Sequence, residues 1–199
     1  MDLFSDDTEQ LLPTDGSAVL HRGVWTPDEA FELFDLLVQD ISWQQPRIEV
    51  FNRSVLQPRL TAWFGDPGRE YSYSGIRLQP SEWTAPLVAV RDRCSDLAGV
   101  KFNSVLANLY RHGSDSVAWH SDNEHELGPE PVIASVSLGA TRRFDFRHRE
   151  TGETVRSELR SGDVVIMSGL SQACWLHQVP KTKKAVGQRV NLTFRVIHV

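Results

Sequence analysis

The spacing of apolar residues changes character near the middle of the chain. In the first half, apolar positions recur every three or four residues in two segments, which predicts amphipathic helices over 26–39 and 85–97. From about residue 104 they recur in short runs separated by turn signals such as His112-Gly113 and Ser161-Gly162. The predicted strands are 104–111, 116–122, 131–138, 142–149, 153–159, 163–168, 174–179 and 188–197. The sequence therefore predicts an α+β chain, with two helices before a sandwich, jelly-roll or barrel core.

The first helix carries a start signal. Thr26 suits the N-cap, Pro27 the first helical position, and Glu29 stands three residues after the cap, as in a capping box. The predicted apolar side of this helix is formed by Phe31, Phe34, Leu37 and Val38. The predicted apolar side of the second helix is formed by Leu87, Val90, Cys94 and Leu97.

Length and composition indicate a globular protein. The chain has 199 residues, of which 40% are apolar and 24% charged, so we expect a single domain over 17–199 after a flexible acidic N-terminus over 1–16. No apolar run approaches the ~18 residues of a membrane helix, and the first residues lack the basic and apolar regions of a secretory signal. Two distant cysteines, Cys94 and Cys174, suit a reducing compartment. We therefore expect a cytoplasmic protein with no membrane partner.

Charge is distributed unevenly along the chain. The net charge is −5, yet the first forty residues hold ten acids and one base, whereas residues 140–189 hold ten Lys/Arg and five acids. The C-terminal half could therefore present a basic surface to phosphates, or the charges could form an ordinary solvated face. The candidate phosphate contacts are Arg142, Arg143, Arg147, Arg149, Lys181, Lys183 and Lys184.

Three residues are candidates for a metal site. His120 and Asp122 are separated by one residue in the predicted strand 116–122, so their side chains would lie on the same face. His177, in the predicted strand 174–179, could supply a third ligand. Two histidines and one carboxylate form the facial triad of non-haem Fe(II) oxygenases. His-x-Asp is short enough to occur by chance, so a surface histidine beside a solvated aspartate remains the alternative.

The last predicted strand alternates strictly between polar and apolar residues. Arg189, Asn191, Thr193 and Arg195 share one face, and Val190, Leu192, Phe194 and Val196 share the other. The apolar face belongs in the core, while the polar face either meets water or lines the interior of a closed jelly roll. In an interior, two guanidiniums would suit a small dianion, because each binds a carboxylate bidentately. Asn108 and Tyr110 offer hydrogen-bonding groups to the same ligand.

These motifs together resemble a known family. In order and spacing, Asn108-x-Tyr110, His120-x-Asp122, His177 and Arg189-x-Asn191-x-x-x-Arg195 are similar to the AlkB family of Fe(II)/2-oxoglutarate dioxygenases, over about residues 45–197. The resemblance implies a double-stranded β-helix (jelly-roll) core over about 101–198 and a nucleotide-recognition lid over about 45–80. We expect the protein to be a monomer.

The resemblance also implies a set of ligands. Fe(II) would be bound by His120, Asp122 and His177, and 2-oxoglutarate, which reacts together with O2, by Asn108, Tyr110, Arg189, Asn191 and Arg195. The implied activity is the oxidative demethylation of N-alkylated bases such as 1-methyladenine and 3-methylcytosine in DNA, with release of formaldehyde. The partner would then be alkylated DNA. A base inside a duplex would have to be flipped out to reach the site.

Further matches point to the branch that repairs double-stranded DNA. Tyr71-Ser72-Tyr73-Ser74-Gly75 is similar to an aromatic lid segment, and Val50-Phe51-Asn52 to a hydrophobic finger that enters the duplex. The implied substrate contacts are Phe51, Arg59, Tyr71, Tyr73 and Glu124. Asn123 departs from the pattern, because that branch often has a second acid at this position. The tyrosines could instead be ordinary strand aromatics, and Phe51 a core residue.

Three alternative functions remain open on the sequence. The same chemistry could act on RNA or on single strands. A cupin-like zinc or manganese protein is a second alternative, although it would have no need of Arg189 and Arg195 as a dianion clamp. A catalytically silent DNA-binding module is the third, and the complete set of metal ligands disfavours it.

Overall fold

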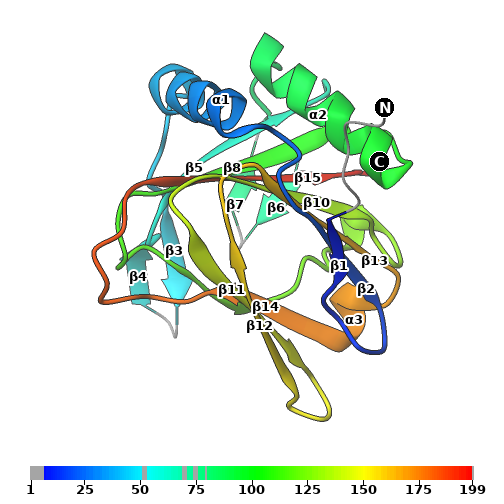
Figure 1. The fold of residues 1–199 in the computed structure, drawn as a ribbon. Helices are drawn as coiled ribbons and strands as arrows, with labels where there is room; N and C mark the ends of the chain where they lie inside the picture. The colour runs from blue at the N-terminus through cyan, green and yellow to red at the C-terminus, as the bar shows by residue number, and fades with distance from the viewer. Residues whose placement is uncertain (1–6, 51–52, 69–70, 74–75, 79, 199) are drawn as a thin grey trace.

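The core of the protein consists of two antiparallel sheets that face one another, as the computed structural model shows for residues 7–50, 53–68, 71–73, 76–78 and 80–198 (Figure 1). The larger sheet has the order β1 (Thr8–Gln10), β2 (Ser17–His21), β13 (Asp163–Ser168), β10 (Ile133–Gly139), β15 (Arg189–Arg195), β8 (Ser104–Tyr110) and β5 (Leu60–Gly65). The smaller sheet has the order β12 (Thr154–Leu159), β11 (Arg142–His148), β14 (Trp175–Val179) and β9 (Val117–His120). This arrangement is a jelly roll, as the sequence predicts. Its larger sheet also contains β1, β2 and β5, so the core is not confined to the predicted range of about 101–198.

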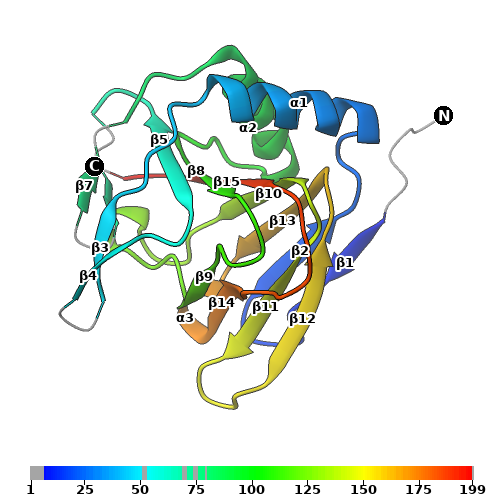
Figure 2. The same ribbon diagram turned by 90° about the vertical axis from the view of Figure 1, so that its left-hand side faces the viewer.

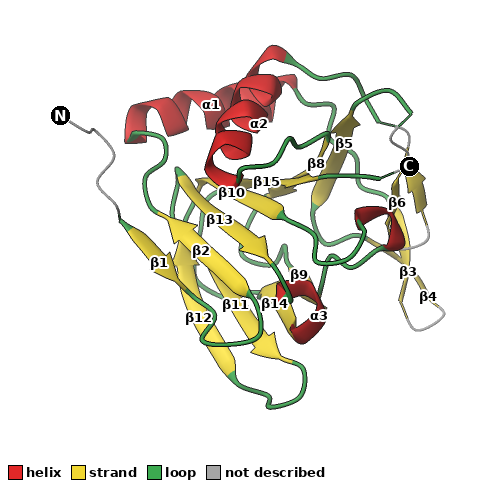
Figure 3. Ribbon diagram, turned by 90° about the vertical axis from the view of Figure 1, so that its right-hand side faces the viewer, coloured by secondary structure: helices red, strands yellow, loops and turns green. Residues whose placement is uncertain are grey.

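Two short hairpins accompany the sheets. One pairs β3 (Arg47–Val50) with β4 (Arg53–Leu56), and the other pairs β6 (Tyr71–Tyr73) with β7 (Ile76–Leu78). Both lie at one side of the two sheets, within the segment that the sequence predicts to be a lid (Figures 2 and 3).

Two helices cover the outer face of the larger sheet (Figures 1 and 3). They are α1 (Pro27–Asp40) and α2 (Ala85–Ala98), and both predictions are confirmed. The capping box of α1 is also present: the Glu29 N–H donates to Thr26 Oγ1 at 3.3 Å, and the Glu29 carboxylate accepts from the Thr26 N–H at 2.8 Å. Among the described residues, no helix is long and apolar enough to span a membrane.

One predicted core contact of α1 is wrong. Phe31 is 65% exposed, whereas Ala30 and Leu37 are buried. The buried stripe passes through Ala30 and, seven residues on, Leu37, with Phe34 packed partly against the core. Phe31 is turned away from this stripe because one residue of a helix corresponds to a rotation of about 100°.

The N-terminal segment is more ordered than the sequence predicts. Residues 8–10 form β1, which pairs with β2, and Leu11 and Leu12 are buried in the core between the sheets. The Trp175 indole N–H donates to the carbonyl of Thr14 at 3.0 Å. Flexibility is therefore the wrong prediction for 8–14, because a polar segment can be held by backbone pairing that its composition does not reveal.

Strand β15 is buried on both faces. Its two neighbours are β10 and β8, so it lies inside the larger sheet rather than at an edge. The apolar side chains of β15 pack in the cluster that includes both helices. Its polar side chains point between the sheets, where Arg189, Asn191, Thr193 and Arg195 are all buried. This confirms the polar-interior alternative and excludes a solvated polar face.

Candidate metal centre and co-substrate pocket

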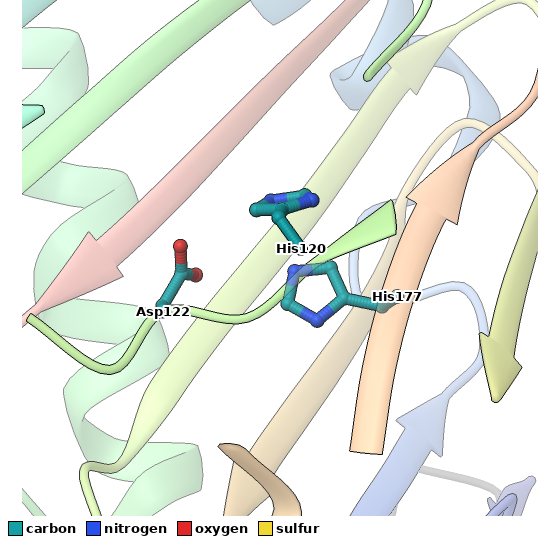
Figure 4. Close-up of side chains that lie close together, drawn as sticks. All are labelled: His120, Asp122 and His177. Atoms are coloured by element: carbon teal, nitrogen blue, oxygen red, sulfur yellow. The ribbon is translucent and has the colours of Figure 1, made fainter. Parts of the chain in front are cut away.

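His120, Asp122 and His177 converge between the sheets (Figure 4). Their potential ligand atoms all lie within 4.8 Å of one another. His120 ends β9 and stands opposite His177 of β14 in the antiparallel register, so the two rings share a face with their centroids 4.3 Å apart. The predicted metal ligands are therefore brought together by pairing between strands that are distant in sequence.

Asp122 is positioned differently from the prediction. Strand β9 ends at His120 instead of residue 122, so the alternation of a strand does not orient Asp122. Its backbone N–H donates to Gln172 Oε1 at 2.9 Å, and its carboxylate accepts from Arg195 Nη2 at 2.9 Å. Gln172 belongs to a short helix, α3 (Ser171–Cys174), that the sequence does not predict. A second unpredicted helical turn, η1 (His125–Leu127), follows Glu124.

The protonation states of the three residues suit a divalent cation. The His120 Nδ1 lies 2.8 Å from the carbonyl of Ala118, which can only accept, so Nδ1 carries the hydrogen and Nε2 keeps its lone pair. Burial lowers the pKa of His120. Burial, and then the neighbouring His120, lower the pKa of His177 to about 3. Burial alone would raise the pKa of Asp122, but Arg195 and the two histidines lower it to about 2. Two neutral imidazoles and one carboxylate are the donor set expected of an Fe(II) facial triad.

The depressed pKa of His177 leads to a prediction for the metal-free protein. As the pH falls below 6.5, the unfolded chain takes up a proton on His177, whereas the folded chain resists protonation down to about pH 3. The free energy of unfolding should therefore fall by about 2 kcal/mol between pH 7 and pH 5 through this group. Urea unfolding at both pH values measures it. His177→Gln should remove this contribution, and the exposed His112→Gln should retain it; an unchanged pH dependence in His177→Gln would contradict the assignment.

The metal ligands share a pocket with most of the predicted co-substrate residues. Asn108, Tyr110, Asn191 and Arg195 line it together with His120, Asp122 and His177. The Asn191 amide donates to Ser135 Oγ and to the carbonyl of Val136, both at 2.9 Å. The side-chain amide of Asn191 is thus held in place by the neighbouring strand β10.

Arg189 lies beside this pocket as a buried cation. Its residue is 1% exposed, its Nη2 donates to Ser137 Oγ at 2.9 Å, and its guanidinium lies 5.2 Å from the centroid of the Tyr110 ring. Its Nε and Nη1 have no hydrogen-bond partner among the residues that the structure describes. Burial lowers the pKa of Arg189 to about 10. A buried guanidinium with donors to spare fits a carboxylate ligand such as one end of 2-oxoglutarate.

The two arginines of β15 have different surroundings. Arg195 forms a buried ion pair with the metal ligand Asp122, whereas Arg189 lies against Tyr110 and Ser137. The sequence predicted that both guanidiniums bind the same dianion, whereas in the structure they have different partners. Ser135 and Ser137, which support Asn191 and Arg189, were not predicted. Their alternation in the predicted strand 131–138 is the signal that could have found them.

The predicted substrate contacts are only partly described by the structure. Arg59 is buried, lines the pocket and donates from Nε to Asn108 Oδ1 at 2.6 Å. Glu124 is half-buried at the start of η1. Tyr71 and Tyr73 belong to β6, while Phe51 lies outside the described residues.

A groove adjoins the metal centre. It is lined by the β3–β4 hairpin, including the exposed Val55 and Leu56, and by Trp119, His120 and Lys181. The groove therefore places apolar side chains and a lysine beside His120.

One predicted phosphate contact is wrong. Arg142 is buried, and its guanidinium donates to the carbonyls of His112, Asp115 and Pro180. These hydrogen bonds connect two loops to β11, so the guanidinium of Arg142 is not available to a phosphate. Arg147 stacks over Trp119 at 4.5 Å from the ring centroid, and Arg149 Nη2 donates to Ser121 Oγ at 2.7 Å.

The fold and the site define a class of protein. A jelly roll that carries two histidines, one carboxylate and a buried cation in one interior is the arrangement expected of a 2-oxoglutarate-dependent Fe(II) oxygenase. Consistently, residues 17–195 match the family model of the 2OG-Fe(II) oxygenase superfamily.

Similar proteins narrow this class. The chain is 42% identical to the human (Homo sapiens) alpha-ketoglutarate-dependent dioxygenase alkB homolog 3, over 94% of this chain and 69% of that protein. It is 37% identical to the mouse (Mus musculus) DNA oxidative demethylase ALKBH2, over 98% of this chain and 86% of that protein. The solved structure of OsALKBH1 shares the fold, with a TM-score of 0.66 at 17% identity, over 95% of this chain and 99% of that one. The chain belongs to the AlkB family of Fe(II)/2-oxoglutarate-dependent dioxygenases.

Proposed function

We propose that this protein removes methyl groups oxidatively from N-alkylated bases in DNA, such as 1-methyladenine and 3-methylcytosine, and releases formaldehyde. The observation that carries the proposal is the group of His120, Asp122 and His177 beside the buried Arg189. The Nε and Nη1 atoms of Arg189 have no hydrogen-bond partner among the described residues and could bind a carboxylate. The similarity to a protein named DNA oxidative demethylase supports DNA as the substrate.

The residues of the chain have distinct parts in this reaction. Bound Fe(II), with 2-oxoglutarate and O2, supplies the oxidising chemistry that hydroxylates a methyl group. Asp122 and the two histidines would hold the metal, and Arg189 would bind one carboxylate of the co-substrate with its unused N–H groups. Asn108, Tyr110 and Asn191 would supply further hydrogen bonds. The hydroxymethylated base then separates into the repaired base and formaldehyde.

The substrate base must leave its stack to reach the buried triad. The groove beside His120 offers a path, because its apolar hairpin side chains and Lys181 suit a base and its phosphates. Glu124 would accept a hydrogen bond from the exocyclic amine of the base, and Tyr71 and Tyr73 would pack around it. Arg143, Lys181, Lys183 and Lys184 would contact phosphates. Asn123, exposed beside Glu124, would adjust the choice of base.

A formaldehyde-release assay tests the proposal. Oligonucleotides bearing 1-methyladenine or 3-methylcytosine are supplied as duplex DNA, single-stranded DNA and RNA at one salt concentration, since phosphate contacts make affinity salt-dependent. We expect formaldehyde to form with DNA only when Fe(II) and 2-oxoglutarate are both present. Preference for RNA would favour the alternative substrate class. Consumption of 2-oxoglutarate without formaldehyde from any methylated strand would refute demethylation.

Duplex repair should depend on Phe51. If this residue fills the gap left by a flipped base, Phe51→Ala should reduce activity on duplex DNA far more than on single strands, because unstacking costs a few kcal/mol per step. Activity on matched duplex and single-stranded substrates measures the difference. Phe31→Ala is the control, because Phe31 is 65% exposed on α1. Equal loss on both substrates, or a loss of stability of about 3–5 kcal/mol, would instead identify Phe51 as a core residue.

A further inference from the structure

Asp122 is the only one of the three proposed metal ligands that lies outside a strand. His120 and His177 are held by the pairing of β9 with β14, but β9 ends two residues before Asp122. The backbone of Asp122 therefore needs another hydrogen-bond partner, since it is buried and outside the ladder. That partner is the Gln172 side chain, whose Oε1 accepts from the Asp122 N–H at 2.9 Å across 50 residues of sequence.

Gln172 is itself fixed. It is 1% exposed, and its Nε2 lies 3.2 Å from Ser171 Oγ and 3.5 Å from Met167 Sδ. Its helix α3 connects β13 with β14, the strand that carries His177. A single amide thus joins the Asp122 loop to the segment that delivers another metal ligand.

We propose that Gln172 is a positioning residue for the metal centre, acting through the backbone of Asp122. The inference rests on the metal site of the proposed function. Asp122 is held at two points: Arg195 directs its carboxylate, and Gln172 directs its main chain. Both hydrogen bonds are present without the metal, so the carboxylate oxygen of Asp122 is already in position. Metal binding then needs no further loss of conformational entropy in the Asp122 loop. Residues that orient metal ligands in this way typically alter metal affinity by about 10–100-fold when they are changed.

Two substitutions separate the acceptor from the bulk of the side chain. Gln172→Met keeps the length of the side chain and removes the amide oxygen, whereas Gln172→Glu keeps an oxygen acceptor. Gln178→Met is the matched control. Gln178 follows His177 directly, but its amide donates to Asp145 Oδ2 at 2.9 Å, so this control removes a hydrogen bond near the site without touching the Asp122 loop.

The measurement is Mn(II) affinity, followed by the electron paramagnetic resonance signal of the free ion, with the melting temperature determined in parallel. We expect Gln172→Met to weaken Mn(II) binding by about 10–100-fold, Gln172→Glu to remain within about threefold of the wild type, and Gln178→Met to keep full affinity. Should Gln172→Met not fold, Gln172→Asn replaces it, because its shorter amide cannot reach the Asp122 N–H in place, and the same weakening is expected.

Wild-type Mn(II) affinity in Gln172→Met, with only a lowered melting temperature, would overturn the proposal. Equal weakening in Gln172→Met and Gln172→Glu would also overturn it, because the oxygen acceptor would then be irrelevant. Mn(II) binding requires no nucleic acid, so these outcomes are independent of whether the protein demethylates DNA.

Discussion

Asp122→Asn is expected to abolish 2-oxoglutarate turnover and to weaken Fe(II) binding by at least the about 10–100-fold that is typical when a residue that merely orients a metal ligand is changed. The substitution replaces the charged ligand of the site with a neutral amide, while the two imidazoles remain neutral. The low pKa of Asp122, about 2, means that this ligand is ionised at every pH at which the protein would work. Titration with Fe(II) under anaerobic conditions and an assay of succinate formation measure the two effects.

The same substitution should also cost stability. Removing one partner of the buried Asp122–Arg195 ion pair typically costs about 3–5 kcal/mol. Asp163→Asn is the control, because Asp163 is buried, pairs with Arg22 at 2.8 Å and does not line the pocket. It should lower stability and leave Fe(II) affinity unchanged. Normal turnover in a folded Asp122→Asn protein would disprove the metal assignment.

Arg189→Met should produce the second large effect, on the co-substrate. Loss of a buried, hydrogen-bonded charge pair costs about 2–5 kcal/mol, which corresponds to a rise in the dissociation constant of 2-oxoglutarate of about 30- to several thousand-fold. Stability without co-substrate should be maintained or increased, because the substitution removes a buried cation whose pKa burial already lowers. Calorimetric titration of 2-oxoglutarate and thermal unfolding measure the two quantities.

Arg142→Met provides a close comparison for Arg189→Met. Arg142 is also buried and also lies near the Tyr110 ring, at 5.6 Å, but its guanidinium donates to three backbone carbonyls. Its loss should therefore lower stability, because three acceptors lose their donor, with little change in 2-oxoglutarate affinity. An unchanged 2-oxoglutarate affinity in Arg189→Met would show that another group binds the carboxylate.

Local patterns in the sequence were sufficient for the two long helices, for the eight strands after residue 103 and for the candidate chemistry, but not for β1 to β7, α3 or η1. The capping signal at Thr26 and the helical spacing of the first half specify α1 and α2, because these preferences act within a few residues. The alternation of β15 separates its apolar and polar faces for the same reason. His120 and Asp122 share a spacing that suits a metal, and the resemblance to the AlkB family singled out His177 from the seven histidines of the chain.

Only the tertiary structure decided where those residues lie. Whether the polar face of β15 meets water depends on the second sheet that covers it, and the pairing of β10 and β8 around it joins segments far apart in the chain. The support of Asp122 by Gln172, the separate surroundings of Arg189 and Arg195, and the commitment of Arg142 to backbone carbonyls follow from the same packing. Such contacts are set by the register and stacking of distant strands, which periodicity within a single segment does not encode.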